Sequence, residues 1–312
     1  MPPSAHLPLV TVVIPTWNRL PLLRQAVASV LAQTWPAWEL VVADDGSDDG
    51  TAAWIAELGD PRITCLSAAR EGHVGRVRNR GAAAGSGPLI AFLDSDDVWL
   101  PEKLEAQVAA LRDAGAEWSF TGYELMDADG RTVPFRAGSG EARSGWIARD
   151  LLAGEIGVDI STLLVTRGLF ERVGGFSEDP RLTARGDHEL VLRLAVGAPV
   201  CGVPRVLTRV GEHPGRLTHA LADPHERSAR VYELFLQHRP PAGLATLARS
   251  AHGEHLRTAA RARLARGEYA AAARLFVRAF RAHPAPGPLA RAAAGAVRDR
   301  LRARSGAMRV AG

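Results

Sequence analysis

Three carboxylates follow one short apolar run, and their spacing points to metal and phosphate chemistry. Residues 89–93 are Leu-Ile-Ala-Phe-Leu, and Asp94, Asp96 and Asp97 come directly after them. An apolar run of this length, bounded by Gly-Pro and by acidic residues, predicts a buried strand. Carboxylates so close together repel one another, and a divalent cation offsets that repulsion. Mn²⁺ and Mg²⁺ prefer oxygen ligands, and Mg²⁺ usually binds one or two carboxylates together with substrate phosphates.

A second acidic cluster follows another predicted strand. Asp44 and Asp45 come after the apolar residues of 38–43. Ligands of open α/β sheets bind at the carboxyl ends of the strands, so we expect both clusters to face one crevice. Taken alone, the segment around Asp96 is more typical of a solvated acidic loop with a helix N-cap at Asp97. The presence of two such clusters favours a ligand site.

The hydrophobic pattern predicts strands and helices in alternation, which is typical of a doubly wound, mostly parallel α/β sheet flanked by helices. We expect strands over 9–14, 38–43, 62–66, 89–93, 116–125, 160–166 and, as two short strands, within 200–210. We expect helices over 20–33, 51–58, within 72–87, over 101–114, 146–152 and 185–196, and a hairpin at Asp129-Gly130. Residues 15–18, Pro-Thr-Trp-Asn, replace the GxGxxG motif of a dinucleotide-binding domain after the first strand. We expect Trp17, Trp35 and Trp38 to pack within the core or at its edge.

The composition is typical of a chain that forms a core and works in the cytoplasm. Of the 312 residues 46% are apolar, and no run approaches the roughly 20 apolar residues of a membrane span. The first residues lack the basic and apolar regions of a signal peptide. Cys65 and Cys201 lie far apart in apolar contexts, so we expect buried free thiols.

The charge is divided unevenly along the chain. Residues 225–312 hold 17 Arg, no Lys and 5 acidic residues, although the whole chain has a net charge of only +4. We therefore expect a main domain over 1–224 and a basic, Ala- and Arg-rich helical region over 225–312. Residues 267–284 resemble the second helix of a tetratricopeptide repeat. The basic helices could contact anionic lipid headgroups or form a solvated arginine face; we expect no nucleic-acid partner.

Seven segments, taken in order over about residues 8–220, resemble the family 2 glycosyltransferases, which have the GT-A fold. They are VVIPTWNR (12–19), VVADDGSDDG (41–50), RNRGAAAGSG (78–87), LIAFLDSDDVWLP (89–101), VGGFSE (173–178), GDHELVLRL (186–194) and GEHPGRLTH (211–219). The resemblance implies transfer of a sugar from a nucleotide-diphosphate donor to an acceptor hydroxyl, with inversion. A glycan, a lipid-linked sugar or a natural product would be the acceptor. No QxxRW motif is present, which argues against a processive synthase.

The resemblance also implies roles for individual residues. The expected nucleotide-sugar contacts are Pro15, Thr16, Asn18, Asp44, Arg78 and Asp94. Asp44 would hold the nucleobase, and Asp96 would bind Mn²⁺ or Mg²⁺, with Asp94 and His213 as further candidate ligands.

The expected catalytic base is Asp187. The family often has Glu-Asp where this chain has Gly186-Asp187, so Glu189 is a rival base. One carboxylate opposite the leaving group is sufficient for inversion by direct displacement. The alternatives are a sugar-1-phosphate nucleotidylyltransferase, which would need a basic Gly-rich loop after the first strand, and a non-catalytic nucleotide-sugar-binding protein.

Overall fold

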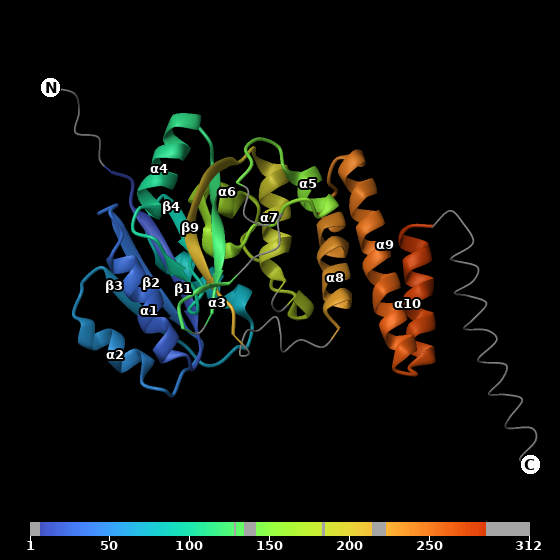
Figure 1. The fold of residues 1–312 in the computed structure, drawn as a ribbon, viewed down its shortest axis with the longest axis horizontal. Helices are drawn as coiled ribbons and strands as arrows, with labels where there is room; N and C mark the ends of the chain where they lie inside the picture. The colour runs from blue at the N-terminus through green and yellow to red at the C-terminus, as the bar shows by residue number, and fades with distance from the viewer. Residues whose placement is uncertain (1–6, 128, 134–141, 183–184, 214–222, 285–312) are drawn as a thin grey trace, which may run out of the picture. The chain divides into compact units, whose positions relative to one another are not determined.

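The computed structural model describes residues 7–127, 129–133, 142–182, 185–213 and 223–284 (Figure 1). The chain divides into two compact units, Met1–Ala220 and Leu221–Gly312. The charge distribution along the sequence predicted a boundary after residue 224. Parts of three predicted segments lie outside the described residues: the surroundings of the hairpin at Asp129-Gly130, the motif 211–219 and the basic helical region 225–312.

The first unit is built on one mixed sheet. Its strands are β1 (Val10–Thr16), β2 (Trp38–Asp44), β3 (Ile63–Ser67), β4 (Leu89–Phe92), β5 (Val98–Trp99), β6 (Trp118–Met126), β7 (Thr132–Val133), β8 (Leu163–Thr166) and β9 (Cys201–Gly211). The order in the sheet is β3-β2-β1-β4-β8-β6-β9-β5, and β7 pairs with β6. Strands β3, β2, β1 and β4 are parallel, as expected. β8 runs antiparallel to both β4 and β6, so the parallel character is confined to the first half and to the β6–β9 pair.

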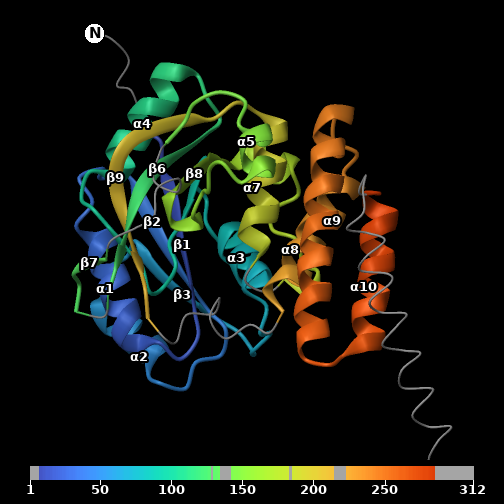
Figure 2. The same cartoon turned by 45° about the vertical axis from the view of Figure 1, so that its right-hand side comes forward.

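Helices cover both faces of this sheet (Figure 2). They are α1 (Leu20–Leu31), α2 (Thr51–Leu58), α3 (Val74–Ala84), α4 (Lys103–Ala114), α5 (Ala148–Ala153), α6 (Arg167–Arg172) and α7 (Gly186–Gly197). Leu23 of α1 and Leu104 of α4 share a buried cluster with Val12 of β1. On the opposite face α3 lies so close that a Cβ on Gly81 would come within 2.5 Å of Val13. The strands are therefore buried on both faces, which explains their nearly continuous apolar sequences.

Several segments differ from the sequence prediction, among them helix α6, which was not predicted. Residues 201–211 form one strand, although two short strands were predicted there. A register shift against β6 near Gly122 accommodates the polar residues that suggested a break between them. The two-residue strand β5 was not predicted, since so short a segment has no periodicity to detect. The expected hairpin at Asp129-Gly130 is present: the Gly130 N–H donates to the Asp127 carbonyl at 3.0 Å.

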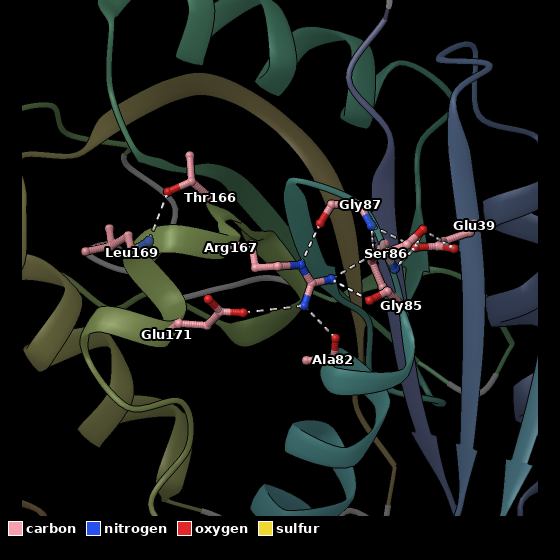
Figure 3. A network of polar contacts seen from close by, with 10 residues as sticks. Glu39, Ala82, Gly85, Ser86, Gly87, Thr166, Arg167, Leu169 and Glu171 are labelled. Carbon is pink, nitrogen blue, oxygen red and sulfur yellow. Dashed lines mark hydrogen bonds and ion pairs between the residues drawn. The ribbon is translucent and has the colours of Figure 1, made fainter.

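A polar network fixes the connection from α3 to β4 at the amino-terminal edge of the parallel strands (Figure 3). Thr11 Oγ1 and the Gly87 N–H donate to Glu39 Oε1 at 2.7 and 2.9 Å. The Arg167 guanidinium donates to the carbonyl oxygens of Gly85 and Gly87 at 3.0 and 2.8 Å. The network satisfies backbone groups that would otherwise lack partners after the helix ends.

The second unit consists, in its described part, of α8 (Pro224–Gln237), α9 (Ala242–Ala265) and α10 (Tyr269–Ala282). Leu256 of α9 and Leu275 of α10 belong to one buried cluster with alanines of α8 and α9. Gly267 has φ +80° in the short α9–α10 connection, a conformation that favours glycine. Arg263 binds Glu268 at 2.5 Å and reinforces the same connection.

Both cysteines are free, as predicted, although each is partly exposed rather than buried. None of the helices within the described ranges has both the length and the apolar character needed to cross a membrane.

Candidate active site

A pocket of about 240 Å³ lies at the carboxyl ends of the parallel strands. Thr16 ends β1, Asp45 directly follows β2, and Asp94 and Asp96 follow β4. The pocket is lined by these residues together with Pro15, Trp17, Arg19, Arg70, Gly72, His73, Val74, Val77, Arg78, Ser95, Asp97, Asp159, Gly186 and Asp187. The two acidic clusters therefore contribute to one crevice, as the order of the strands required.

Arg78 brings a buried positive charge into this acidic pocket. It belongs to α3, is 5% exposed, and its Nη2 lies 2.5 Å from Asp94 Oδ1. Burial opposes its charged form, but the charges of Asp94 and Asp187 outweigh burial and raise the pKa of Arg78 above its ordinary value. The guanidinium is therefore a permanent cation beside the carboxylates that follow β4.

Two buried polar atoms in the pocket wall have no hydrogen-bond partner among the described residues. They are Thr16 Oγ1 and Arg78 Nε. Buried donors and acceptors are normally satisfied, and leaving one unpaired costs about 1–3 kcal/mol. Both residues line the pocket.

Asp96 is held between two cationic or potentially cationic side chains. Its Oδ2 lies 2.9 Å from Arg19 Nη1 and 3.0 Å from His213 Nε2. His213 reaches it because Gly211, at the end of β9, passes so close that a Cβ there would lie 2.3 Å from the Asp96 carbonyl oxygen. Within the described residues no three His, Cys, Asp or Glu side chains form a group that could hold a metal alone. One carboxylate and one imidazole do fit a Mn²⁺ or Mg²⁺ that takes its other ligands from phosphate and water.

Asp97, the third carboxylate of the cluster, supports the loop. Its Oδ2 accepts from Ser161 Oγ at 2.5 Å, and its Oδ1 accepts from the Gly211 N–H at 2.9 Å. Burial, together with the charge of Asp159, raises the pKa of Asp97 well above its ordinary value. The carboxyl group thus links the loop after β4 to the end of β9.

The two candidate bases have different surroundings. Asp187 is in the first turn of α7 and lines the pocket. Glu189 is 0% exposed, and both of its oxygens are bound by Arg193, at 2.7 and 2.5 Å. The structure therefore presents Asp187, and not Glu189, to a molecule in the pocket.

The predicted nucleotide contacts divide into two groups. Pro15, Thr16, Arg78 and Asp94 line the pocket, whereas Asp44 and Asn18 are not among its lining residues.

Asp44 is 2% exposed and accepts hydrogen bonds from Ser47 and Ser67. Asn18, at φ +48°, accepts from the Asp48 N–H at 2.9 Å. Both side chains shape the loops that carry Trp17 and Asp45.

Trp17 and Arg70 are pocket residues that the sequence analysis did not select. We expected Trp17 to pack in the core or at its edge, but it is 43% exposed and lines the pocket. The Arg70 guanidinium lies 3.1 Å from the Trp17 ring centroid. The position of Trp17 directly after Thr16 was the available signal, since Thr16 was already a predicted contact.

The sheet and the acidic pocket at its carboxyl edge define an α/β protein with a candidate ligand site at the ends of its parallel strands. Residues 11–135 match the family described as Glycosyl transferase family 2, and this part of the chain belongs to that family. The chain is 38% identical over 125 residues to TuaG of Bacillus subtilis (strain 168), named as a teichuronic acid biosynthesis glycosyltransferase; the match covers 39% of this chain and 50% of TuaG.

A second relative is the Escherichia coli protein WfgD, named as a UDP-Glc:alpha-D-GlcNAc-diphosphoundecaprenol beta-1,3-glucosyltransferase. It is 35% identical over 119 residues, which are 38% of this chain and 47% of WfgD. The chain thus spans about half the length of these two relatives. An uncharacterized glycosyltransferase of Rickettsia typhi is 27% identical over 76% of this chain and 74% of its own length.

The fold matches that of TarS from S. aureus. The structure of TarS 1-349 in complex with UDP-GlcNAc superimposes with a TM-score of 0.63 and 19% identity, over 80% of this chain and 72% of that one. The predicted family and the GT-A fold, with its C-terminal helices, are therefore confirmed.

Proposed function

We propose that this protein is an inverting glycosyltransferase that uses a nucleotide-diphosphate sugar. The observation that carries the proposal is the pair of unsatisfied buried atoms, Thr16 Oγ1 and Arg78 Nε, in the wall of a pocket that also contains Asp96 and Asp187. One hydroxyl that can donate or accept and one guanidinium cation in the pocket wall suit a nucleotide diphosphate. A carboxylate elsewhere in the wall suits proton removal from a hydroxyl.

The nucleobase would stack on Trp17. Its indole is exposed at the pocket wall, and an aromatic ring can stack with any base. Asp44 would accept an N–H from the base edge. Ser47 and Ser67 occupy three of the roughly four acceptor positions of its carboxylate, which leaves one on Oδ2. Asn18 and Pro15 would contribute through the shape of the loop.

The diphosphate would meet a cation at Asp96. Asp96 and His213, with Asp94 as a further candidate, would hold Mn²⁺ or Mg²⁺. When bound, such an ion neutralises the charge that develops on the departing diphosphate. Arg19 contacts the same carboxylate oxygen, so its guanidinium would have to move away from Asp96 when the metal binds. The guanidinium would then be able to donate to phosphate oxygens.

Asp187 would act as the base. It takes the proton of the acceptor hydroxyl while the hydroxyl oxygen bonds to the anomeric carbon and the bond from that carbon to the diphosphate oxygen breaks. Attack from the face opposite the leaving group inverts the anomeric configuration. The charge of Asp187 is among those that raise the pKa of Arg78, so the guanidinium remains cationic near the proposed base.

The names of relatives and neighbours suggest a substrate class for this chain. WfgD is named for UDP-glucose and a diphosphoundecaprenol-linked acceptor, and TarS was solved with UDP-GlcNAc. We therefore propose a UDP-sugar donor and a glycan or lipid-linked acceptor.

The second unit is rich in arginine, and Arg227, Arg249 and Arg281 are examples. With a lipid-linked acceptor, these positive charges would favour contact between the second unit and the anionic inner face of a membrane. Sedimentation with anionic and with neutral vesicles tests this: binding to neither argues for a solvated arginine face.

Product analysis tests the proposed activity. The protein is incubated with UDP-, GDP- and dTDP-sugars, with and without Mn²⁺ and with candidate lipid-linked acceptors. Release of the nucleoside diphosphate supports a glycosyltransferase. Release of pyrophosphate would instead indicate a nucleotidylyltransferase, and donor binding without any turnover would indicate a nucleotide-sugar-binding protein.

A further inference from the structure

A buried ion pair lies within α7, and its carboxylate, Glu189, is two residues from Asp187. Arg193 Nε and Nη2 donate to the two oxygens of Glu189 at 2.7 and 2.5 Å. Glu189 is 0% exposed and Arg193 is 7% exposed. A pair buried to this extent loses much hydration, so burial alone does not make it stabilising. Its other contacts indicate a positional role.

The pair also connects α7 to the turn after α6. Arg193 donates from Nη1 to the Val173 carbonyl and from Nη2 to the Gly175 carbonyl, the latter at 2.8 Å. The planar guanidinium can make these bonds and the bidentate bond to Glu189 at once, which an ammonium cannot do. Glu189 fixes the orientation of the guanidinium, and Arg193 fixes the turn against α7.

The same turn is held from its other side by α3. Asn79 Oδ1 accepts from the Phe176 N–H at 2.8 Å, and Asn79 Nδ2 donates to the Phe176 carbonyl at 2.9 Å. Gly175, at φ +64°, permits this approach, since a Cβ there would lie 2.8 Å from Asn79 Oδ1. Asn79 is the neighbour of Arg78, which binds Asp94 in the pocket. A continuous set of hydrogen bonds thus connects α7 to the helix that carries Arg78.

We propose that Glu189 and Arg193 are positioning residues that set the start of α7, and with it Asp187, relative to Arg78 and Asp94. The inference rests on the proposed function, in which Asp187 is the base. It assigns Glu189 a role that needs no contact with substrate. A displacement of about 1 Å of a reacting group can lower a rate about 100-fold, so a small movement of α7 is sufficient to matter.

Two variants separate positioning from simple stability. Arg193→Lys keeps a charge beside Glu189 but cannot reach both carbonyl oxygens. The double variant Glu189→Leu/Arg193→Met replaces the pair by apolar side chains, a change that is often neutral or stabilising for the fold. Arg172→Met is the matched control, because Arg172 ends α6 and binds the partly exposed Glu117 at 2.7 Å.

For both variants we expect kcat to fall about 10–100-fold, which is the usual effect of losing the contacts that support a functional group. The KM for the donor should change less than about twofold. Arg172→Met should leave both constants unchanged. Hydrogen–deuterium exchange of the 312-residue chain should become faster in residues 173–176 and 186–190 and stay unchanged in β1 and β2. Asp187→Asn should lose kcat without this change in exchange.

Unchanged kcat in the double variant, or unchanged exchange in residues 186–190, would overturn the positioning role. If the wild-type protein turned over no donor, the proposed function would fail. The exchange experiment would then still decide whether the pair sets the position of α7.

Discussion

The Arg19 guanidinium lies 2.9 Å from the carboxylate of Asp96, at the oxygen that His213 also contacts. Asp96 has only 9% of its side chain exposed, so its charge needs a partner inside the protein. Arg19 supplies that charge in the structure described. In the proposed complex, a divalent ion with a nucleotide diphosphate would supply the positive charge. Arg19 and the ion cannot both contact Asp96 Oδ2, so the two arrangements are mutually exclusive.

Asp96→Asn should weaken metal-dependent donor binding. The amide keeps the size of the side chain but removes the charge that attracts both Arg19 and a metal. We expect the affinity for UDP-sugar in Mn²⁺ to fall at least about 10–100-fold, and the difference between Mn²⁺ and chelator to disappear. Calorimetric titration measures both. Asp113→Asn, an exposed carboxylate on α4, is the control. Persistence of the full Mn²⁺ dependence in Asp96→Asn would exclude Asp96 as a metal ligand.

Asp187→Asn should abolish transfer and preserve binding. The amide occupies the same volume in the pocket wall but cannot take the proton of the acceptor. We expect kcat to fall about 10²–10⁴-fold with the donor dissociation constant unchanged. Steady-state kinetics and calorimetry on the same preparation separate the two effects. Retention of more than a tenth of wild-type kcat would assign the base to another residue.

Trp17→Ala should weaken binding of the nucleoside diphosphate itself. The loss of one stacked base is worth about 1–3 kcal/mol, which is about a 5- to 150-fold change in affinity. Quenching of tryptophan fluorescence by UDP should be largely absent from this variant. Trp146→Ala, which removes an indole that is 66% exposed and does not line the pocket, should behave as wild type. Equal affinity in all three proteins would show that the base binds elsewhere.

Glu39 should make stability depend on pH. Burial opposes ionisation of Glu39, but hydrogen bonds from Thr11, Ser86 and Gly87 outweigh it and lower its pKa below the ordinary 4.5. A carboxyl whose folded pKa is lowered contributes stability above the unfolded pKa, and this contribution is lost as the pH falls through the folded pKa. Glu39→Gln should therefore cost about 1–3 kcal/mol at neutral pH and less in acid.

Urea unfolding at neutral and at acidic pH measures this difference. Glu57→Gln, an exposed residue of α2, is the control and should change neither value. An equal loss of stability in Glu39→Gln at both pH values would show that charge on Glu39 does not stabilise the network of Figure 3.

The parallel half of the sheet could be predicted because its signals are local. β1, β2 and β4 are short apolar runs that end in polar or acidic residues, and parallel strands present those ends at one edge. Asp94 and Asp96 could therefore be selected for one site, whereas Asp187 was selected from the resemblance to the family. The direction of β8 could not be predicted, because a buried apolar strand has the same composition in parallel and antiparallel pairs.

Individual side-chain roles depended on packing that a sequence does not reveal. Asp44 and Asp45 are adjacent acids, yet only Asp45 lines the pocket. Glu189 is two residues from Asp187 but is turned into the protein, where Arg193 holds it. Trp17 has the same indole as the buried Trp38, and only the surrounding loop determines which one is exposed.

A crystal structure with UDP and Mn²⁺ tests the central claim most directly, since Mn²⁺ is located by its anomalous scattering. We predict one manganese peak in contact with Asp96 and the diphosphate, the uracil ring on Trp17, and Arg19 withdrawn from the Asp96 carboxylate. A nucleotide bound outside this pocket, or a manganese peak remote from Asp96, would contradict the account.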